Sequence, residues 1–286
     1  MSYRNKQELI ALLQKHGLWT KKSLGQNFLV NPQVIGKIID SAQISAHDRI
    51  VEVGPGLGIL TQALLSRAAH VRAIEYDQKL IPLLQKTFAP ALGHTLELIH
   101  ADALATPLPA YDYKLVANIP YYITSPLLNH FLQPDTVAKR PTLIVLLVQK
   151  EVAEKICASE PDHSILSLQI QIFGRPEIVA IVSKTNFFPQ PKVDSAILKI
   201  TTYQEPLIQN LKTFFQLIKG TFAQKRKTLS NSLRSTLALS REQVLALLLG
   251  AGIAANRRPQ SLSINEWQKL TEITSCHEDG LNSDDP

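Results

Sequence analysis

The sequence predicts an α/β protein with a Rossmann-like sheet of seven mostly parallel strands, an antiparallel hairpin at one sheet edge and a small all-helical C-terminal domain. Three observations predict this arrangement. Short apolar runs alternate with helical stretches between residues 49 and 159, which is typical of parallel strands covered by helices on both faces. Two further apolar runs follow without a helix between them. Beyond Tyr203 only helical periodicity remains.

The first part of the chain, residues 1–47, is expected to form a helical N-terminal arm. Residues 7–16 have an amphipathic pattern, and a basic and polar segment follows them. The pair Asn31-Pro32 predicts the start of a second helix, because the first helical turn does not need the N–H that proline lacks.

The sheet is predicted from seven apolar runs, which are Arg49–Val53, Val71–Glu75, Glu97–His100, Tyr113–Asn118, Thr142–Gln149, Glu177–Ser183 and Ala196–Thr202. Helices are expected between or after the first five runs, at Leu60–Arg67, Gln78–Phe88, Ser125–Leu132 and Lys150–Ser159. The last two runs predict the antiparallel pair. A first domain that includes the N-terminal arm is therefore expected over residues 1–203.

The C-terminal part is expected to be helical over residues 204–275. Its apolar residues have helical spacing in four segments, which are Leu207–Phe222, Leu229–Leu237, Arg241–Leu249 and Ile264–Thr274. The polar tail, residues 276–286, is predicted to be disordered because it has little apolar surface to bury.

The composition argues against several classes of protein. The longest apolar run, residues 143–148, is too short to span a membrane, and the N-terminus lacks the apolar core of a signal peptide, so a cytoplasmic protein is expected. Neither cysteine belongs to a CxxC pair and the histidines form no HxxxH or HExxH pattern, so no metal is expected. The net charge of +6 favours a polyanionic partner only mildly.

A glycine-rich turn follows the first predicted strand. Gly54, Gly56 and Gly58 have the spacing GxGxG, and the third glycine of a dinucleotide fingerprint is replaced by Ile59. Glycines let the backbone approach a ligand at the carboxyl end of a strand, although a tight turn alone would also explain them. The spacing favours a nucleoside ligand over a pyrophosphate.

Two carboxylates follow the next two strands. Glu75 ends the second strand, where it could accept hydrogen bonds from both ribose hydroxyls or could be a solvated acid. Asp102 follows the third strand, where it could accept from the amine of a cofactor adenine or could cap a turn. Together with the glycine turn and Asn118 after the fourth strand, they predict S-adenosylmethionine as cofactor and a class I methyltransferase fold.

The segment Asn118-Ile119-Pro120-Tyr121 is predicted to be the catalytic corner. The Asn118 side-chain oxygen and the Ile119 carbonyl are two acceptors that could converge on one exocyclic amine, while the Tyr121 ring stacks on the attached base. Such a grip suits methyl transfer to the amine of adenine.

Substrate contacts are predicted in two further places. Phe187 and Phe188, in a loop stiffened by two prolines, could cover the other face of a flipped base, or could be a core residue and a rigid turn. Basic residues predicted to contact RNA phosphates are Lys21, Lys22, Lys225, Arg226, Lys227, Arg234, Arg257 and Arg258. The alternative for such runs is a solvated face.

These motifs resemble one family, the bacterial 16S ribosomal RNA adenine N6-dimethyltransferases. The resemblance runs through nearly the whole chain and is carried by segments 24–29, 51–58, 118–121, 148–153, 187–195 and 225–233. It implies cofactor contacts from Asn27, Leu29, Gly54, Glu75, Asp102 and Asn118. It also implies dimethylation of two adjacent adenosines in a hairpin near the 3′ end of 16S rRNA, within an immature 30S subunit, by an enzyme expected to be monomeric.

The chain departs from the family pattern at two places, and two other functions stay open. Residues 122–125 replace a commoner Asn-Ile-Ser-Thr, and residues 162–164 stand where relatives often carry a Tyr-Gly or Tyr-Ser pair. Both departures bear on the pocket and not on the reaction. The alternatives are a related methyltransferase acting on 23S RNA or DNA, and a non-catalytic RNA-binding assembly factor that keeps the fold.

Overall fold

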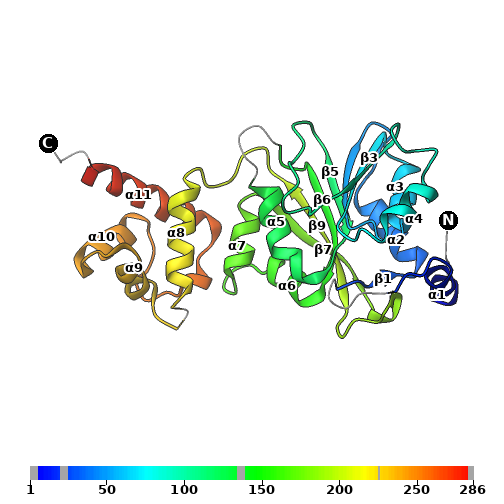
Figure 1. Ribbon diagram of the computed structural model, residues 1–286. Coiled ribbons are helices and arrows are strands. Elements are labelled where there is room, and N and C mark those ends of the chain that lie inside the picture. The colour runs from blue at the N-terminus through cyan, green and yellow to red at the C-terminus, as the bar shows by residue number, and fades with distance from the viewer. Residues whose placement is uncertain (1–5, 20–24, 134–138, 225, 283–286) are drawn as a thin grey trace. The chain divides into compact units, whose positions relative to one another are not determined.

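The computed structural model describes residues 6–19, 25–133, 139–224 and 226–282 (Figure 1). The chain divides into two compact units. The first contains residues 1–154 and 175–202, and the second contains residues 155–174 and 203–286. The first unit holds the sheet and the second is helical.

The first unit is built on a seven-stranded sheet with the order β4-β3-β2-β5-β6-β9-β7. Neighbouring strands from β4 to β6 are parallel, and β9 pairs antiparallel with β6. The strands are β2 (Arg49–Val53), β3 (His70–Glu75), β4 (Leu96–His100), β5 (Lys114–Asn118), β6 (Leu143–Gln149), β7 (Gly174–Val182) and β9 (Ser195–Thr202). The fold class predicted from the sequence is confirmed.

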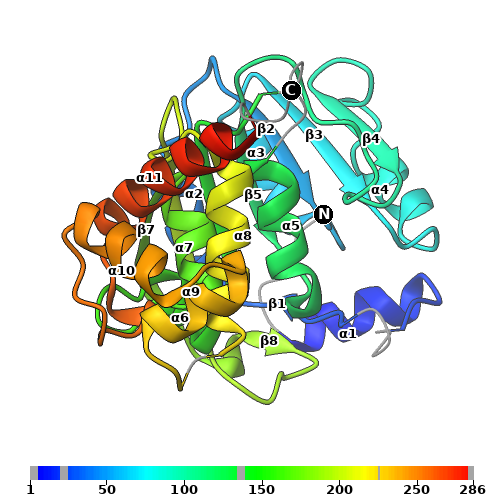
Figure 2. The ribbon, with the colours of Figure 1, turned by 90° about the vertical axis from the view of Figure 1, so that its left-hand side faces the viewer.

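Helices cover both faces of this sheet. On one face lie α2 (Pro32–Ser41), α3 (Ile59–Leu65) and α4 (Ile81–Thr87), and the opposite face carries α5 (Thr124–Leu132) and α6 (Lys150–Cys157), as the two views show (Figures 1 and 2). The central strands are buried on both sides; every residue from Leu143 to Val148 in β6 is buried. This double burial is why the strand sequences are continuously apolar rather than alternating.

The N-terminal arm contains α1 (Lys6–Lys15) and a two-residue strand, β1 (Phe28–Leu29). β1 pairs antiparallel with β8 (Phe187–Phe188), a second two-residue strand that lies between β7 and β9 in the sequence. α2 begins as predicted at Asn31-Pro32, and the Asn31 side-chain oxygen accepts a hydrogen bond of 2.9 Å from the Gln33 N–H.

The second unit packs around a tryptophan. Trp267 is fully buried, and its ring lies 6.4 Å from that of Phe214 and 6.3 Å from that of Phe222. The helices of this unit are α7 (Ile165–Gln171), α8 (Leu211–Phe222), α9 (Leu229–Leu237), α10 (Arg241–Gly250) and α11 (Ile264–Asn282). α11 continues past Thr274, where the helical pattern was expected to end.

Within the described residues, no helix is both long and apolar enough to span a membrane. The same residues contain no group of three or more His, Cys, Asp or Glu side chains that could hold a metal ion. Cys157 and Cys276 form no disulfide with each other.

Candidate active site

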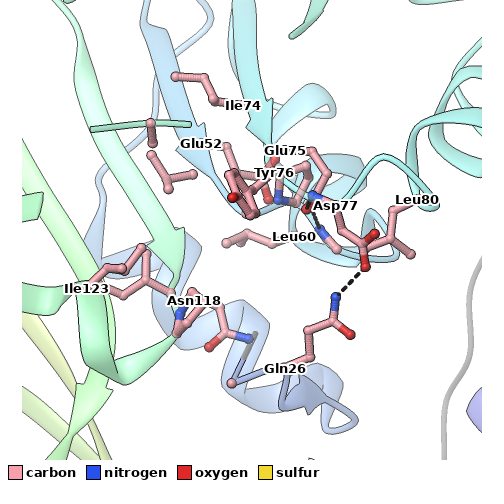
Figure 3. A pocket seen from close by; sticks show the side chains of 18 of the residues that line it. Gln26, Glu52, Leu60, Ile74, Glu75, Tyr76, Asp77, Leu80, Asn118 and Ile123 are labelled. Carbon is pink, nitrogen blue, oxygen red and sulfur yellow. Dashed lines mark hydrogen bonds between the residues drawn. The ribbon is translucent and has the colours of Figure 1, made fainter. Parts of the chain in front are cut away.

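The predicted cofactor residues meet in one cavity of about 390 Å³ in the first unit (Figure 3). The strand order explains this. β4, β3, β2 and β5 are neighbours in the sheet. The chain adds β3 and β4 on one side of β2 and then crosses over to add β5 on the other side, so the topological switch point lies between β2 and β5. Their carboxyl ends therefore present four predicted groups along one edge of the sheet, at the point where such folds bind ligands. The predicted residues that line the cavity are Asn27, Leu29, Gly54, Gly56, Glu75, Asp102, Asn118, Ile119, Pro120 and Tyr121.

The glycine turn adopts backbone conformations that favour glycine. Gly54, Gly56 and Gly58 have φ angles of 69°, 60° and 84°. A Cβ at Gly56 would lie 3.1 Å from the Phe28 ring, and one at Gly58 would lie 2.5 Å from the Phe88 ring. The turn thus brings backbone rather than side chains to the cavity wall.

Glu75 ends β3 as a buried carboxyl held by two backbone donors. Its Oε2 accepts from the Gly56 N–H at 3.0 Å and its Oε1 from the Asp77 N–H at 2.7 Å. Burial raises the pKa of Glu75, and these hydrogen bonds oppose the rise. Since each carboxylate oxygen can accept more than one hydrogen bond, Glu75 can still receive ribose hydroxyls.

A second carboxyl lies deeper in the wall. Glu52 in β2 is 1% exposed, and its Oε2 has no hydrogen-bond partner among the described residues. Burial raises the pKa of Glu52 to about 8; the Thr61 hydroxyl lowers it only in part, and Glu75 raises it further. The structure places Glu52 in the cavity lining.

Asp102 lies at the rim of the cavity, exposed to solvent. Its Oδ1 accepts a 2.9 Å hydrogen bond from the Leu104 N–H, so it caps the turn that follows β4. The turn-capping alternative is therefore present in the structure. It leaves the carboxylate with further acceptor capacity for a cofactor amine.

The corner after β5 is held from two sides. The Asn118 Nδ2 donates to the Asn27 backbone oxygen at 3.4 Å, which leaves Oδ1 as the acceptor of this side chain. The Tyr121 hydroxyl forms a 2.7 Å hydrogen bond with Ser195 Oγ at the start of β9, and Ser195 is fully buried. Burial raises the pKa of Tyr121, so its hydroxyl stays protonated.

The two predicted stacking phenylalanines lie outside the cavity lining. Phe187 is buried at 4% exposure and belongs to the hydrophobic core, pairing in register with Leu29. Phe188 is half-buried, and the Lys6 ammonium lies 5.2 Å from its ring centroid. The structure thus places Phe187 as the core residue of the alternative interpretation, while base stacking by Phe188 stays a prediction.

The predicted RNA-contacting residues divide into three groups. Lys21, Lys22 and Lys225 lie outside the described residues. Arg257 is half-buried, and its guanidinium donates to Glu266 and to the Ser261 carbonyl, so it ties two segments of the helical unit together. The exposed residues of this set are Arg226, Lys227, Arg234 and Arg258.

Several cavity residues escaped the sequence reasoning. Gln26, Tyr76 and Tyr122 all line it, and Tyr76 and Tyr122 are 60% and 62% exposed. Tyr76 stands between the two buried acids Glu75 and Asp77, which was the signal that could have identified it. For Tyr122 the available signal was its position after the catalytic corner.

The donor set fits S-adenosylmethionine. The glycine turn offers a close backbone approach, and Glu75 offers acceptors for hydroxyls. The buried Glu52 carboxyl, whose Oε2 has no partner among the described residues, adds a polar group that can hydrogen-bond a ligand. Those same residues would hold the cofactor.

Comparisons with known proteins agree with this geometry. The family model for ribosomal RNA adenine dimethylases matches residues 17–275. The chain is 42% identical over 267 residues to the ribosomal RNA small subunit methyltransferase A of Dehalococcoides mccartyi, covering 91% of this chain and 90% of that protein. It is 40% identical to the protein of the same name from Enterococcus faecalis, with 91% and 92% covered.

Solved structures of similar fold include two adenine or rRNA methyltransferases. A dimethyladenosine transferase from Plasmodium falciparum has a TM-score of 0.76 at 28% identity, covering 88% of this chain and 98% of that one. The 23S rRNA methyltransferase ErmE has a TM-score of 0.70 at 28% identity, covering 87% and 100%. The chain therefore belongs to the ribosomal RNA adenine dimethylase family, and it is an S-adenosylmethionine-dependent methyltransferase.

Proposed function

We propose that the protein methylates the N6 amines of two adjacent adenosines in a hairpin near the 3′ end of 16S rRNA and dimethylates both. Its substrate is an immature 30S subunit, on which it acts as a cytoplasmic monomer. The small-subunit names of the relatives support this choice of RNA. The observation that carries the reaction is Asn118 in the cavity wall, with its amide nitrogen engaged by Asn27.

The corner activates the amine by hydrogen bonding. When bound, the cofactor supplies an electrophilic methyl group on a sulfonium. The adenine amine is a poor nucleophile because its lone pair is delocalised into the ring. Asn118 Oδ1 and the Ile119 carbonyl accept the two amine hydrogens, and this favours a pyramidal nitrogen whose lone pair is available. Holding the reactants together supplies the rest of the acceleration.

Tyr121 orients the flipped base. Its ring lines the cavity, and its hydrogen bond to the buried Ser195 fixes the position of the hydroxyl end of the ring. A base withdrawn from its stack can lie against this ring, as in other enzymes that act on extruded bases. A fixed ring presents the amine to Asn118 at a constant angle, which serves both methyl transfers.

The test uses 16S rRNA in small-subunit particles from cells that lack this methylation. Particles are incubated with the wild-type enzyme, Asn118→Ala or Asn129→Ala, and the RNA is analysed by mass spectrometry. Wild type and Asn129→Ala, a change in α5 outside the cavity lining, yield two dimethylated adenosines. Asn118→Ala is expected to be slower by at least ~100-fold, as when one preorganised polar group is lost from a transition state.

Two other outcomes would redirect the assignment. Faster methylation of naked 23S RNA than of the particles would favour the 23S alternative, which the similarity to ErmE makes worth including. Full methyl transfer by Asn118→Ala, with cofactor affinity unchanged by calorimetry, would show that the catalytic corner lies elsewhere.

A further inference from the structure

One short segment of the N-terminal arm contacts both halves of the cavity. Gln26 and Asn27 belong to the lining, and Gln26 lies between Asp77, after β3, and Asn118, at the end of β5 (Figure 3). Gln26 is half-buried. Its side chain reaches across 51 residues of sequence to Asp77.

On the cofactor side, a chain of hydrogen bonds connects Gln26 to the glycine turn. The Gln26 Nε2 donates to Asp77 Oδ2 at 3.0 Å, and Asp77 Oδ1 accepts from the Lys79 N–H at 3.1 Å. The Asp77 N–H donates to Glu75 Oε1 at 2.7 Å, and Glu75 Oε2 accepts from Gly56. Asp77 and Glu75 are 6% and 5% exposed, so the two acids themselves are shielded from water.

The Gln26 side chain is an uncharged hydrogen-bond donor to Asp77. Glu75 and Asp77 are buried side by side, and the negative charge of Asp77 raises the pKa of Glu75. An amide donates a hydrogen bond to Asp77 without adding a positive charge of its own. The carboxylates therefore keep their negative field for a cationic ligand, which a lysine or arginine at position 26 would cancel.

On the substrate side, the same segment is fixed to the catalytic corner. The Asn27 carbonyl accepts from Asn118 Nδ2 at 3.4 Å. At Gly25, where φ is 60°, a Cβ would lie 3.4 Å from both Pro120 and the Tyr122 ring, so the corner packs closely against this backbone. Any shift of Gln26 would consequently move the carbonyl that orients the Asn118 amide.

We propose that Gln26 is a positioning residue that acts through Asp77 to hold Glu75 for the cofactor, and through the adjoining backbone to hold Asn118 for the base. The role rests on the cofactor function proposed for Glu75. It makes cofactor affinity and amine activation depend on one side chain that touches neither reacting atom.

The test is a double-mutant cycle read by calorimetry of S-adenosylmethionine binding. Gln26→Met keeps the length of the side chain and removes the donor, and it is expected to weaken cofactor binding roughly tenfold, as the loss of a hydrogen bond to a charged group would. Asp77→Ala weakens binding as well. The double variant binds no more weakly than Asp77→Ala alone, because the Gln26 contribution passes through Asp77.

Two controls separate this role from general destabilisation. Gln33→Met, at an exposed position of α2, leaves affinity at the wild-type level. The circular dichroism spectrum of Gln26→Met without cofactor matches that of the wild type at the temperature of the binding assay, so the weaker binding does not come from unfolded protein. Methyl transfer at saturating cofactor is still slower in Gln26→Met, which reports the effect on Asn118.

Three results would overturn the inference in distinguishable ways. Unchanged affinity in Gln26→Met, with Glu75→Ala weakened, removes the role of Gln26 and leaves the cofactor site intact. Additive losses in the double variant show that Gln26 does not act through Asp77. Unchanged affinity in Glu75→Ala removes the cofactor function of Glu75, on which the inference rests.

Discussion

Glu52 has the most unusual environment of the cavity residues. An acid whose pKa is about 8 in the folded protein and about 4.5 in the unfolded chain binds more protons when folded over the interval between those values. Stability from this group is therefore lost as the pH rises through that window. The protonated carboxyl is the form that the buried position favours.

We expect Glu52→Gln to be more stable than the wild type at about pH 9, by an amount on the order of a few kcal/mol. The advantage shrinks as the pH falls towards 5, because the wild-type carboxyl is then neutral. Urea denaturation at both pH values measures this difference, with Glu205→Gln at an exposed position as the baseline. An equal difference at both pH values would contradict the assigned protonation.

At the scale of elements, the packing of the end of α4 against the turn before α3 depends on Gly58. Gly58 precedes α3 with a φ of 84°, and the Phe88 ring at the end of α4 occupies the space of a Cβ there. Gly93 has a similar φ of 76°, but nothing lies within 4 Å of its added Cβ. Comparing alanine substitutions at the two glycines therefore separates the cost of backbone strain from the cost of a side-chain collision.

Gly93→Ala is expected to cost about 1–2 kcal/mol of unfolding free energy, from the left-handed backbone alone. Gly58→Ala is expected to cost a further ~1–3 kcal/mol, because the added methyl collides with the Phe88 ring. Chemical denaturation of both variants gives the two values. Equal costs would mean that the Phe88 ring moves aside freely.

The elements that could be predicted from sequence are those with enough residues to show a period. All seven strands of the sheet were predicted, and β2 matches to the residue; the central strands β2, β5 and β6 are the clearest because they are buried apolar runs. The β1–β8 pair was not predicted, since two-residue strands have no period. α7 was also missed; its capping box uses Ser164 and Ser167 rather than the commoner glutamate at the third position.

The site could be predicted where its residues end consecutive strands. Glu75, Asp102 and Asn118 were found because strand ends meet at one edge of a parallel sheet. Side-chain contacts between separate segments could not be predicted in this way. The hydrogen bonds of Gln26 to Asp77 and of Arg257 to Glu266 are examples. No local pattern distinguishes an arginine that binds its own chain from one that would bind RNA.

For the whole molecule, the charge distribution bears on RNA binding. The chain carries +6, and four of the residues predicted to contact RNA phosphates, Arg226, Lys227, Arg234 and Arg258, are exposed in the helical unit. Phosphate contacts release counterions, so each one adds to the dependence of affinity on salt. These contacts would position the RNA rather than specify its sequence.

We expect a variant with Arg226, Lys227 and Arg234 changed to Gln to bind 16S rRNA with a flatter salt dependence. The slope of log affinity against log salt should fall by about 2–3, or roughly 0.7–0.9 for each lost contact. A matched variant changes the exposed Lys37, Arg67 and Lys86 of the sheet-bearing unit to Gln. Equal slopes for the two variants would assign the first three residues to a solvated surface.

The pairing of Phe28–Leu29 with Phe187–Phe188 joins two segments of the catalytic unit that lie far apart in the sequence. A fragment of the chain must therefore contain both segments to form this pair. A chain shortened to begin at residue 31 would uncover the apolar Phe187 ring. It would also leave the backbone of Phe187 and Phe188 without the strand that pairs with it. Such a protein would lose its ligand-holding wall and gain a surface prone to self-association.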